Sequence, residues 1–454
     1  MNFNLTLPAH VSDLISRLHS AGFSAYVVGG CVRDSLLNLT PHDWDICTSA
    51  LPEQMQSVFS GLHTVETGLK HGTLTVIVEH VPYEVTTYRI DGDYTDHRHP
   101  DSVRFVDDLT QDLARRDFTV NAMAWSPDAG LADPFGGQRD LADGLIRCVG
   151  KPEQRFDEDA LRVLRALRFA SVYGFAIEPA TASALRAKAP DLKLVAGERI
   201  REELLKLLCG KAVGRILREY PEVIAEIIPE IRPMIGYDQR NHHHSYDLWE
   251  HTVQGVEGVP ADPVLRLVML LHDTGKPVVR TTDEKGEGHY RGHPKVSEEI
   301  ARRTAESLRL DNAFRDRLCT LVLHHDTPLR TEAGEINTDR SFLLRRLNRY
   351  GEENLRALFL IHCSDRIATG YSTPEREKAR LAERMAALDA LLAEQPCFAL
   401  KDLAVNGRDL TAAGLKGKAV GEALQSLLEA VMDGRVPNEK EALLSELAGK
   451  NSDA

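Results

Sequence analysis

The sequence predicts an α+β fold, in which a small mixed β-sheet head precedes an elongated, all-helical remainder. Two observations lead to this prediction. Short apolar runs with strand-like alternation dominate the first part of the chain, whereas from about Asp157 onward apolar residues recur at helical spacing. The length of 454 residues is also enough for about two to four domains with substantial cores.

The head alternates strands with short helices. Strand patterns cover Ser24–Val28, Asp43–Cys47, Thr73–Glu79 and Pro82–Tyr88, and a helix begins within Val32–Leu37. Helical patterns follow at Glu158–Tyr173, Glu198–Leu208, Pro263–Leu271, Lys295–Leu308, Phe314–His324 and Glu375–Glu394. Polar and Gly- or Pro-containing stretches divide the chain into a head (1–147), a helical neck (148–240), a third domain (241–370) and a helical tail (371–454).

The composition excludes several classes of protein. With 55 basic and 68 acidic residues, the net charge of −13 disfavours an extensive nucleic-acid coat or an anionic-membrane binder. No stretch approaches the roughly 20 apolar residues of a membrane span. Seven cysteines without a CxxC motif fit a reducing compartment. We therefore expect a cytoplasmic protein without a membrane partner; a local basic face and the oligomeric state stay open.

A glycine pair lies between the first strand and the first helix of the head. In Val27–Asp34, Gly29 and Gly30 would allow the backbone to approach a phosphate closely, and the following helix offers free N–H groups to an anion. Arg33 lies in the first helical turn, where a cation is unfavourable without an anionic partner. This pattern indicates phosphate binding, although a tight connection alone would also explain the glycines.

Two carboxylates follow on the next predicted strand. Residues i and i+2 of a strand point to one face, so Asp43 and Asp45 would project together. Their repulsion would be relieved by divalent cations, as in Mg²⁺ sites that act on nucleotide phosphates. Glu84 could supply a third carboxylate from a neighbouring strand. The alternatives are a solvated strand end for the pair and an ordinary exposed acid for Glu84.

These elements, with four further motifs in order, resemble the nucleotidyltransferase superfamily, specifically the bacterial-type tRNA nucleotidyltransferase and poly(A) polymerase family. The further motifs are Ala114–Ala122, Asp133–Gly137 with Asp140–Leu141, Glu158–Arg162, and Glu198–Leu204. The resemblance implies addition of CCA to the 3′ end of tRNA from CTP and ATP, with Mg²⁺ held by Asp43 and Asp45. Rival functions are an A-adding tRNA nucleotidyltransferase or poly(A) polymerase.

The resemblance also implies roles for individual residues. Asp159 and Arg162 would read the base of the incoming nucleotide, with help from Arg165; because they are three residues apart on a helix, an intrahelical salt bridge is the alternative. An intact loop at Arg89–Val103 is associated with full CCA addition or A addition. The remaining nucleotide-binding residues would be Gly29, Gly30, Arg33, Arg115, Arg116, Asp117 and Asn121.

A second constellation lies in the helical part. An apolar helix, Val264–Leu271, ends at His272–Asp273, and imidazole and carboxylate ligands suit Ni²⁺, Mn²⁺, Fe²⁺ or Zn²⁺. The ordered set resembles the HD phosphohydrolase superfamily, which implies metal-dependent hydrolysis of a phosphoester and makes a chiefly hydrolytic protein a further rival. The alternatives are ligands kept for stability or a domain that only docks tRNA. The set comprises His251, His272, Asp273, His293, His324, His325 and Asp365. We expect His242–His244 to be solvated.

Two segments are candidates for RNA contact. Leu145–Tyr220 contains 15 basic and 10 acidic residues, an excess of five positive charges in a chain of net charge −13. We expect tRNA to lie along it, with an affinity that falls as salt rises. In the tail, Lys416–Lys418 opens a helix that could hold a backbone phosphate, although a packing corner is an equal alternative.

Overall fold

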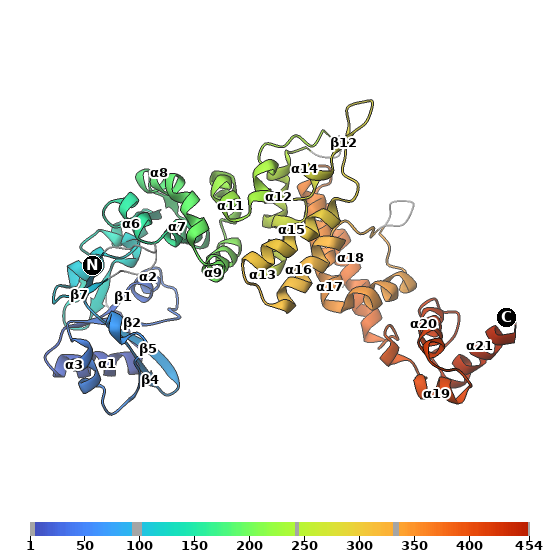
Figure 1. Ribbon diagram of the computed structural model, residues 1–454, viewed down its shortest axis with the longest axis horizontal. Helices are drawn as coiled ribbons and strands as arrows, with labels where there is room; N and C mark the ends of the chain where they lie inside the picture. The colour runs from blue at the N-terminus through green and yellow to red at the C-terminus, as the bar shows by residue number, and fades with distance from the viewer. Residues whose placement is uncertain (1–4, 93–101, 241–244, 330–335, 453–454) are drawn as a thin grey trace. The chain divides into compact units, whose positions relative to one another are not determined.

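The computed structural model describes residues 5–92, 102–240, 245–329 and 336–452. It divides into two compact units, Met1–Arg232 and Pro233–Ala454 (Figure 1). An α/β head precedes helical segments, which confirms the predicted α+β class. Among the described residues, no helix is both long and apolar enough to cross a bilayer.

A seven-stranded mixed sheet forms the centre of the head. The β2–β5 pair is parallel, and the other neighbouring strands are antiparallel. Helices α1 (Ala9–Ser20) and α3 (Pro52–Val58) pack next to each other and against β1 and β4 (Figure 1). In spatial order, the strands are β3 (His63–Val65), β4 (Thr73–Val78), β5 (Val81–Thr87), β2 (Asp45–Thr48), β1 (Ala25–Val28), β8 (Ala124–Ser126) and β9 (Gly130–Ala132).

Strand β2 begins two residues later than the sequence predicts, because its pairing with β1 stops at the end of β1. The last pair in their register is Val28 with Asp45. Directly after Val28, Gly29 adopts a positive φ of 80° and turns the chain into α2 (Gly30–Leu36). Asp43 therefore has no partner in β1 and lies in the segment before β2. The argument that Asp43 and Asp45 share one strand face is thus wrong, and a different part of the fold must bring them together.

The predicted helix Glu158–Tyr173 is interrupted near its start. Helix α6 (Pro152–Glu158) ends before Asp159, which is extended with φ −145° and ψ 105°. The Asp159 carboxylate accepts a hydrogen bond from the Leu161 N–H at 3.1 Å. Such a local side-chain bond competes with helix continuation and favours the start of a new helix. The new helix is α7 (Leu161–Tyr173).

Further elements complete the first unit. The short strands β6 (Arg89–Asp91) and β7 (Val103–Phe105) pair outside the main sheet, as do β10 (Leu145–Ile146) and β11 (Ala176–Ile177). The other α-helices of this unit are α4 (Leu109–Ala114), α5 (Gly137–Ala142), α8 (Pro179–Lys188), α9 (Gly197–Leu208), α10 (Val213–Glu219) and α11 (Pro221–Ile227).

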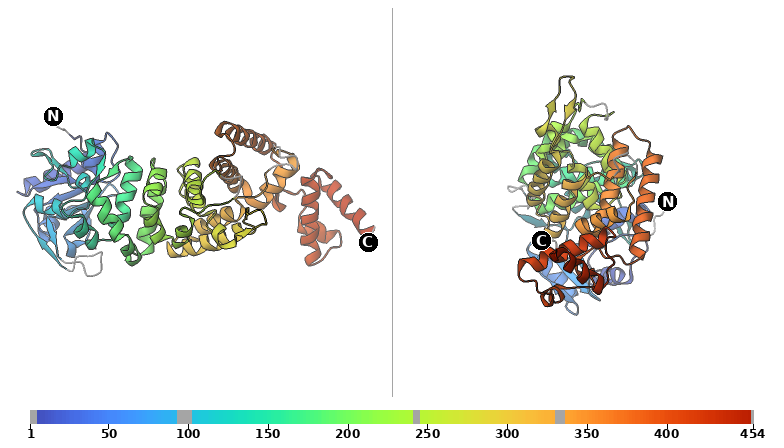
Figure 2. Two further views of the ribbon diagram at one scale, coloured as in Figure 1. Left: turned by 90° about the horizontal axis from the view of Figure 1, so that it is seen from above. Right: turned by 90° about the vertical axis from the view of Figure 1, so that its right-hand side faces the viewer.

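The described part of the second unit is helical apart from a short hairpin, β12 (Thr281–Thr282) and β13 (Gly288–His289) (Figure 2). Helix α17 is kinked at Gly351, where φ is 73°. The helices are α12 (Leu248–Gly258), α13 (Pro263–Leu271), α14 (Lys276–Val279), α15 (His293–Ser307), α16 (Asn312–His324), α17 (Arg340–Ala368), α18 (Pro374–Ala393), α19 (Gly407–Ala412), α20 (Lys418–Met432) and α21 (Lys440–Ser452).

Candidate active site

A pocket of about 500 Å³ in the first unit gathers most of the predicted head residues. Seven arginines and four aspartates line it, so the lining carries an excess of positive charge that suits an anionic ligand. Glu84 is outside the lining. The residues that line the pocket are Gly29, Gly30, Arg33, Asp43, Asp45, Arg115, Arg116, Asp117, Asn121, Asp159, Leu161, Arg162, Arg165, Arg168, Phe169 and Arg199.

Backbone geometry favours glycine at position 29, and a larger residue would also have to displace the end of the Arg116 side chain. Its φ of 80° is unfavourable for other residues, and a Cβ atom there would lie 3.0 Å from the Arg116 guanidinium. The Gly29 N–H also donates to the Met123 carbonyl at 3.0 Å. The turn at Gly29 thus lets the backbone pass close to Arg116, a candidate for phosphate binding.

Arg33 is held in place on three sides. It donates to Asn121 Oδ1 at 2.5 Å and to both carboxylate oxygens of Asp34 at 2.9 and 3.0 Å. Its guanidinium also lies about 5 Å from the ring centroids of Phe169 and Tyr173. A buried cation fixed in this way needs little reorganisation to bind an anionic ligand.

Asp117 holds Arg165 and Asn121 in place by accepting their hydrogen bonds. It is buried, and its Oδ2 accepts two hydrogen bonds from Arg165 at 2.7 and 2.9 Å, while Asn121 and the Phe118 N–H donate to Oδ1. Burial raises the pKa of Asp117, but Arg165, the Asn121 hydrogen bond and Arg162 outweigh it and hold the pKa well below its usual range. Asp117 is therefore an ionised anchor for Arg165 and Asn121.

Asp159 and Arg162 both line the pocket, but each has a different ionic partner. Arg199 donates to the two oxygens of Asp159 at 3.2 and 2.7 Å. Arg162 donates to Glu158 at 2.5 Å. The salt bridge between Asp159 and Arg162 that the sequence left open is thus replaced by two separate ion pairs, which hold the carboxylate and the guanidinium at the same pocket.

The carboxylates fit a divalent cation. Asp43 and Asp45 line the same pocket although only Asp45 belongs to a strand. Partial burial raises the pKa of Asp45, Arg116 lowers it, and the charges of Glu84 and Asp43 raise it. Neighbouring carboxylates are stabilised by a cation between them, and oxygen ligands are those that Mg²⁺ prefers.

A second site lies in the helical unit, where ligand atoms form two groups that share Asp273. One group consists of His251, His272, Asp273 and Asp365, and the other of Asp273, His293 and His325. Asp273 Oδ2 lies 3.2 Å from Nε2 of both His251 and His272, and Oδ1 lies 3.2 Å from His293 Nε2. A carboxylate with one oxygen in each group could bridge two ions.

The orientation of the imidazoles favours cations in these groups. In His272, His293 and His325, the Nδ1 atom lies 2.7–2.9 Å from a backbone carbonyl oxygen, so Nδ1 donates to that oxygen and Nε2 is the atom that a neutral ring offers to a metal. The Nε2 atoms of His293 and His325 face each other at 3.2 Å. A proton or a shared cation lies between two imidazole nitrogens this close, and the Asp273 carboxylate beside them suits a cation.

His324 is the one predicted ligand that the structure places apart. Its ring lies 5.0 Å from the Tyr350 ring, outside both ligand groups. His324 is the last residue of α16 and turns toward Tyr350 on α17, whereas His325 faces His293 and Asp273. Burial lowers the pKa of His324, and nearby Arg349 and Arg346 lower it further.

Sequence comparisons assign the chain to a family. Its segments match the family profiles of the poly A polymerase head domain (residues 25–147), the RNA and SrmB-binding site of polymerase A (174–232) and tRNA nucleotidyltransferase domain 2 (295–447). Over 211 residues, 46% of this chain, it is 50% identical to the CCA-adding enzyme of Limosilactobacillus fermentum, and this alignment spans 52% of that relative. Over 446 residues, it is 32% identical to the CCA-adding enzyme of Limosilactobacillus reuteri, covering 96% of this chain and 94% of the relative. The chain belongs to the CCA-adding enzyme family.

The fold supports the same assignment. The crystal structure of the Bacillus stearothermophilus CCA-adding enzyme in complex with CTP is 31% identical to this chain, covers 99% of both chains, and superposes with a TM-score of 0.71. For this member of the CCA-adding enzyme family, the roles of individual residues and the resemblance of the second unit to HD phosphohydrolases stay predictions.

Four pocket residues had no assigned role in the sequence-based prediction: Leu161, Arg168, Phe169 and Arg199. Arg168 and Phe169 extend the face of α7 that carries Arg162 and Arg165, so their helical spacing of i+3 and i+4 from Arg165 could have indicated them. Arg168 lies 3.8 Å from the Phe169 ring centroid and pairs with Glu203. Arg199 belongs to a recognised motif, but its pairing with Asp159 depends on how α9 packs against α7, which local sequence does not reveal.

Two predictions fall partly or wholly outside the described residues. The expected mobile loop Arg89–Val103 includes 93–101, which lie outside, whereas its ends belong to β6 and β7. Of the histidine run His242–His244, no residue is described.

Proposed function

We propose that this chain adds CCA to the 3′ end of tRNA from CTP and ATP at the pocket of the head. The observation that carries the proposal is the convergence of Asp43 and Asp45, seven arginines and the Asp159–Arg162 pair on one cavity. Membership of the CCA-adding enzyme family over nearly the full chain supports it.

In the reaction, the 3′ oxygen of tRNA attacks the α-phosphorus of the nucleotide. A new phosphodiester bond forms, the bond between the α-phosphorus and the oxygen that joins it to the β-phosphorus breaks, the 3′-hydroxyl proton passes to water, and pyrophosphate leaves. Asp43 and Asp45 would hold Mg²⁺, which would supply positive charge to offset that of the reacting phosphates. Arg33, Arg115 and Arg116 would bind the triphosphate, so that catalysis consists mainly of positioning and charge neutralisation.

Asp159 and Arg162 suit the selection of C and A. Both bases present an amino donor beside a ring-nitrogen acceptor, which match a carboxylate acceptor and a guanidinium donor. U and G present a carbonyl and a ring N–H in the reverse order, so each would meet two unfavourable contacts. Arg199 and the Leu161 N–H occupy part of the Asp159 carboxylate and thereby fix its orientation toward the pocket.

Incubation with tRNA that lacks CCA tests the proposal. We expect incorporation of CMP when CTP is supplied alone, and of one further AMP when ATP is added, because the site accepts both bases. Nucleotide incorporation into labelled tRNA is the measurement. Incorporation of AMP but never CMP would support an A-adding enzyme or poly(A) polymerase instead, and no incorporation would leave a hydrolase.

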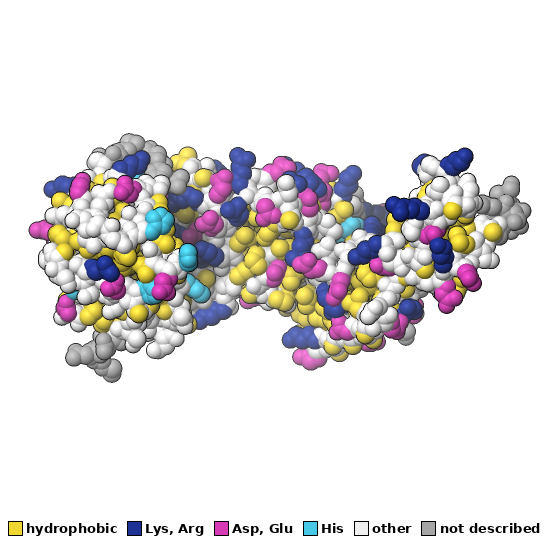
Figure 3. Space-filling model, turned by 90° about the horizontal axis from the view of Figure 1, so that it is seen from below, with side chains coloured by type: hydrophobic (Ala, Val, Ile, Leu, Met, Phe, Trp, Pro, Cys, Tyr) yellow, Lys and Arg dark blue, Asp and Glu magenta, His cyan; other side chains and the backbone are white. Residues whose placement is uncertain are grey.

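Binding of tRNA should depend on the basic segment Leu145–Tyr220. On the face drawn in Figure 3, basic and acidic side chains lie intermixed, so net charge alone does not locate the RNA. If the five excess charges face phosphates, Kd should rise by about two orders of magnitude between 50 and 200 mM salt. A phosphate contact from exposed Lys416 or Lys418 at the start of α20 would add to this dependence.

Variants of two exposed lysines on this segment test the location. Replacing both Lys206 and Lys211 by Gln should weaken tRNA binding and lower the slope of log Kd against log salt by up to about two. The control is Lys285→Gln, an exposed lysine of the β12–β13 turn. Equal slopes for the double variant, the control and the unaltered chain would place the RNA elsewhere.

A second candidate function is metal-dependent hydrolysis of phosphoesters in the helical unit. The facing Nε2 atoms of His293 and His325, together with the Asp273 bridge, favour this reading over ligands without a metal. The donor set fits Ni²⁺, Mn²⁺, Fe²⁺ or Zn²⁺, and such an ion would supply Lewis-acid chemistry toward a phosphoester. All seven cysteines are free thiols, which supports a cytoplasmic location for both activities.

A further inference from the structure

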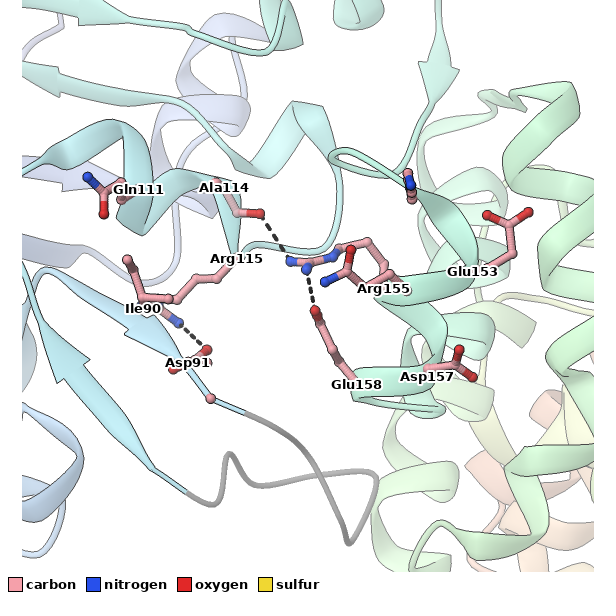
Figure 4. Close-up of a pocket in the computed structure, with 12 residues that line it drawn as sticks. Ile90, Asp91, Gln111, Ala114, Arg115, Glu153, Arg155, Asp157 and Glu158 are labelled. Carbon is pink, nitrogen blue, oxygen red and sulfur yellow. Dashed lines mark hydrogen bonds and ion pairs between the residues drawn. The ribbon is translucent and has the colours of Figure 1, made fainter.

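We infer that Arg155 is a positioning residue for base selection, which acts on Arg162 through Glu158. The inference rests on the proposed function of the head pocket. Arg155 is buried near the end of α6 and does not line the nucleotide pocket. It lies instead at a neighbouring hollow of about 700 Å³, between β6, α4 and α6 (Figure 4).

Arg155 joins two elements of the first unit. Its guanidinium donates to the Ala114 carbonyl at 3.0 Å, at the end of α4, and pairs with Glu158 Oε1 on its own helix (Figure 4). Ala114 directly precedes the phosphate-binding candidates Arg115 and Arg116. The side chain of Arg155 therefore fixes the end of α6 relative to the triphosphate-binding segment.

Glu158 is shared between two guanidiniums. Its Oε1 binds Arg155, and its Oε2 accepts a hydrogen bond from Arg162 at 2.5 Å. Arg162 also donates to the backbone carbonyls of Arg155 and Arg115, each at 3.1 Å. Arg162 is thus held by three acceptors. One is the backbone carbonyl of Arg155 itself, and another is Glu158, whose carboxylate Arg155 also binds.

The Glu158 carboxylate, which Arg155 and Arg162 share, explains how Arg155 affects recognition of the nucleotide base. A carboxylate and a guanidinium prefer a bidentate arrangement with two parallel hydrogen bonds. Without Arg155, Oε1 of Glu158 becomes available to Arg162, which would then turn both donors toward Glu158 and away from the pocket. A donor lost from the pocket weakens recognition of C and A and removes the unfavourable contact that rejects U and G.

The test compares Arg155→Ala with Arg155→Lys on tRNA that lacks CCA. The measured quantity is kcat/KM for CTP divided by kcat/KM for UTP, a ratio in which the fraction of folded enzyme cancels. We expect the ratio to fall about tenfold or more in Arg155→Ala, as the loss of a charged hydrogen bond implies. Lysine keeps the charge but cannot hold Ala114 and Glu158 together, so Arg155→Lys should restore the ratio partly.

Arg147→Ala is the matched control. Arg147 lies in the same unit, pairs with Asp140 and Glu178 at 3.1 and 3.5 Å, and lines neither hollow. Its loss should lower Tm without changing the ratio. The double variant Arg155→Ala/Glu158→Ala should have the same CTP-to-UTP ratio as Glu158→Ala alone, because Arg155 acts on Arg162 only through Glu158.

Three outcomes overturn the inference: an unchanged ratio in Arg155→Ala, a ratio that falls equally in Arg147→Ala, or strictly additive effects of Arg155→Ala and Glu158→Ala. Should Arg155→Ala fail to fold, Arg155→Lys and Glu158→Ala still decide between these outcomes. Failure of the proposed function is distinguishable, because the unaltered chain would then incorporate no CMP at all.

Discussion

Asp43→Ala should abolish nucleotide incorporation, with a loss of about a thousandfold or more in kcat for CMP addition. The physical reason is that Asp43 and Asp45 are the two carboxylates of the pocket proposed to hold Mg²⁺. Removal of one ligand withdraws the positive charge that offsets the charge developing on the transferred phosphoryl group, an effect of several kcal/mol. Single-turnover incorporation of CMP into tRNA that lacks CCA is the measurement.

Two further readouts show whether the effect lies in the chemistry. CTP binding measured without added metal should change little in Asp43→Ala, because the arginines that face the triphosphate are intact. Hydrolysis of a phosphoester by the helical unit should also persist. The matched control is Asp143→Ala, which removes an exposed acid of the head that pairs with Arg139 outside the pocket. Persistent CMP incorporation in Asp43→Ala would refute the assignment.

Asp273→Asn should remove metal from both ligand groups of the helical unit at once. Asp273 places one carboxylate oxygen in each group, so the amide leaves an oxygen for one group at most and removes the negative charge that both groups share, while it keeps the volume of the side chain. Alanine would leave the buried Lys276 and two histidines without their carboxylate, at a cost of about 3–5 kcal/mol in stability. Metal content after incubation with Mn²⁺, Ni²⁺ or Zn²⁺, and phosphoester hydrolysis, are the measurements.

Neighbouring histidines provide the control. His325→Ala should weaken metal binding, whereas His324→Ala should not, because only His325 belongs to a ligand group. All three variants should retain CMP incorporation in the head. Equal metal content in Asp273→Asn and the unaltered chain, or an equal loss in His324→Ala and His325→Ala, would contradict the proposed centre.

Local sequence predicted the elements well where apolar periodicity decides the structure. The predicted helix Pro263–Leu271 has the observed bounds, and the four strands predicted in the head differ by one or two residues at their ends, whereas β3, β8 and β9 of the same sheet were not predicted. The failures occur where a long-range partner or a side-chain bond overrides the pattern. Strand β2 begins at Asp45 because β1 turns away at Gly29, and the helix at Glu158 is interrupted because Asp159 bonds the Leu161 N–H.

The sequence by itself determined the α+β class, the order of the motifs and the residue types of both sites, because periodicity, glycine turns and ligand chemistry are local properties. Tertiary structure decided which side chains meet. It brought Asp43 to the pocket from outside the strand, paired Asp159 with Arg199 rather than Arg162, and separated His324 from His325. Packing of distant elements sets these contacts, and a linear pattern contains neither the distance nor the direction of a side chain from another element.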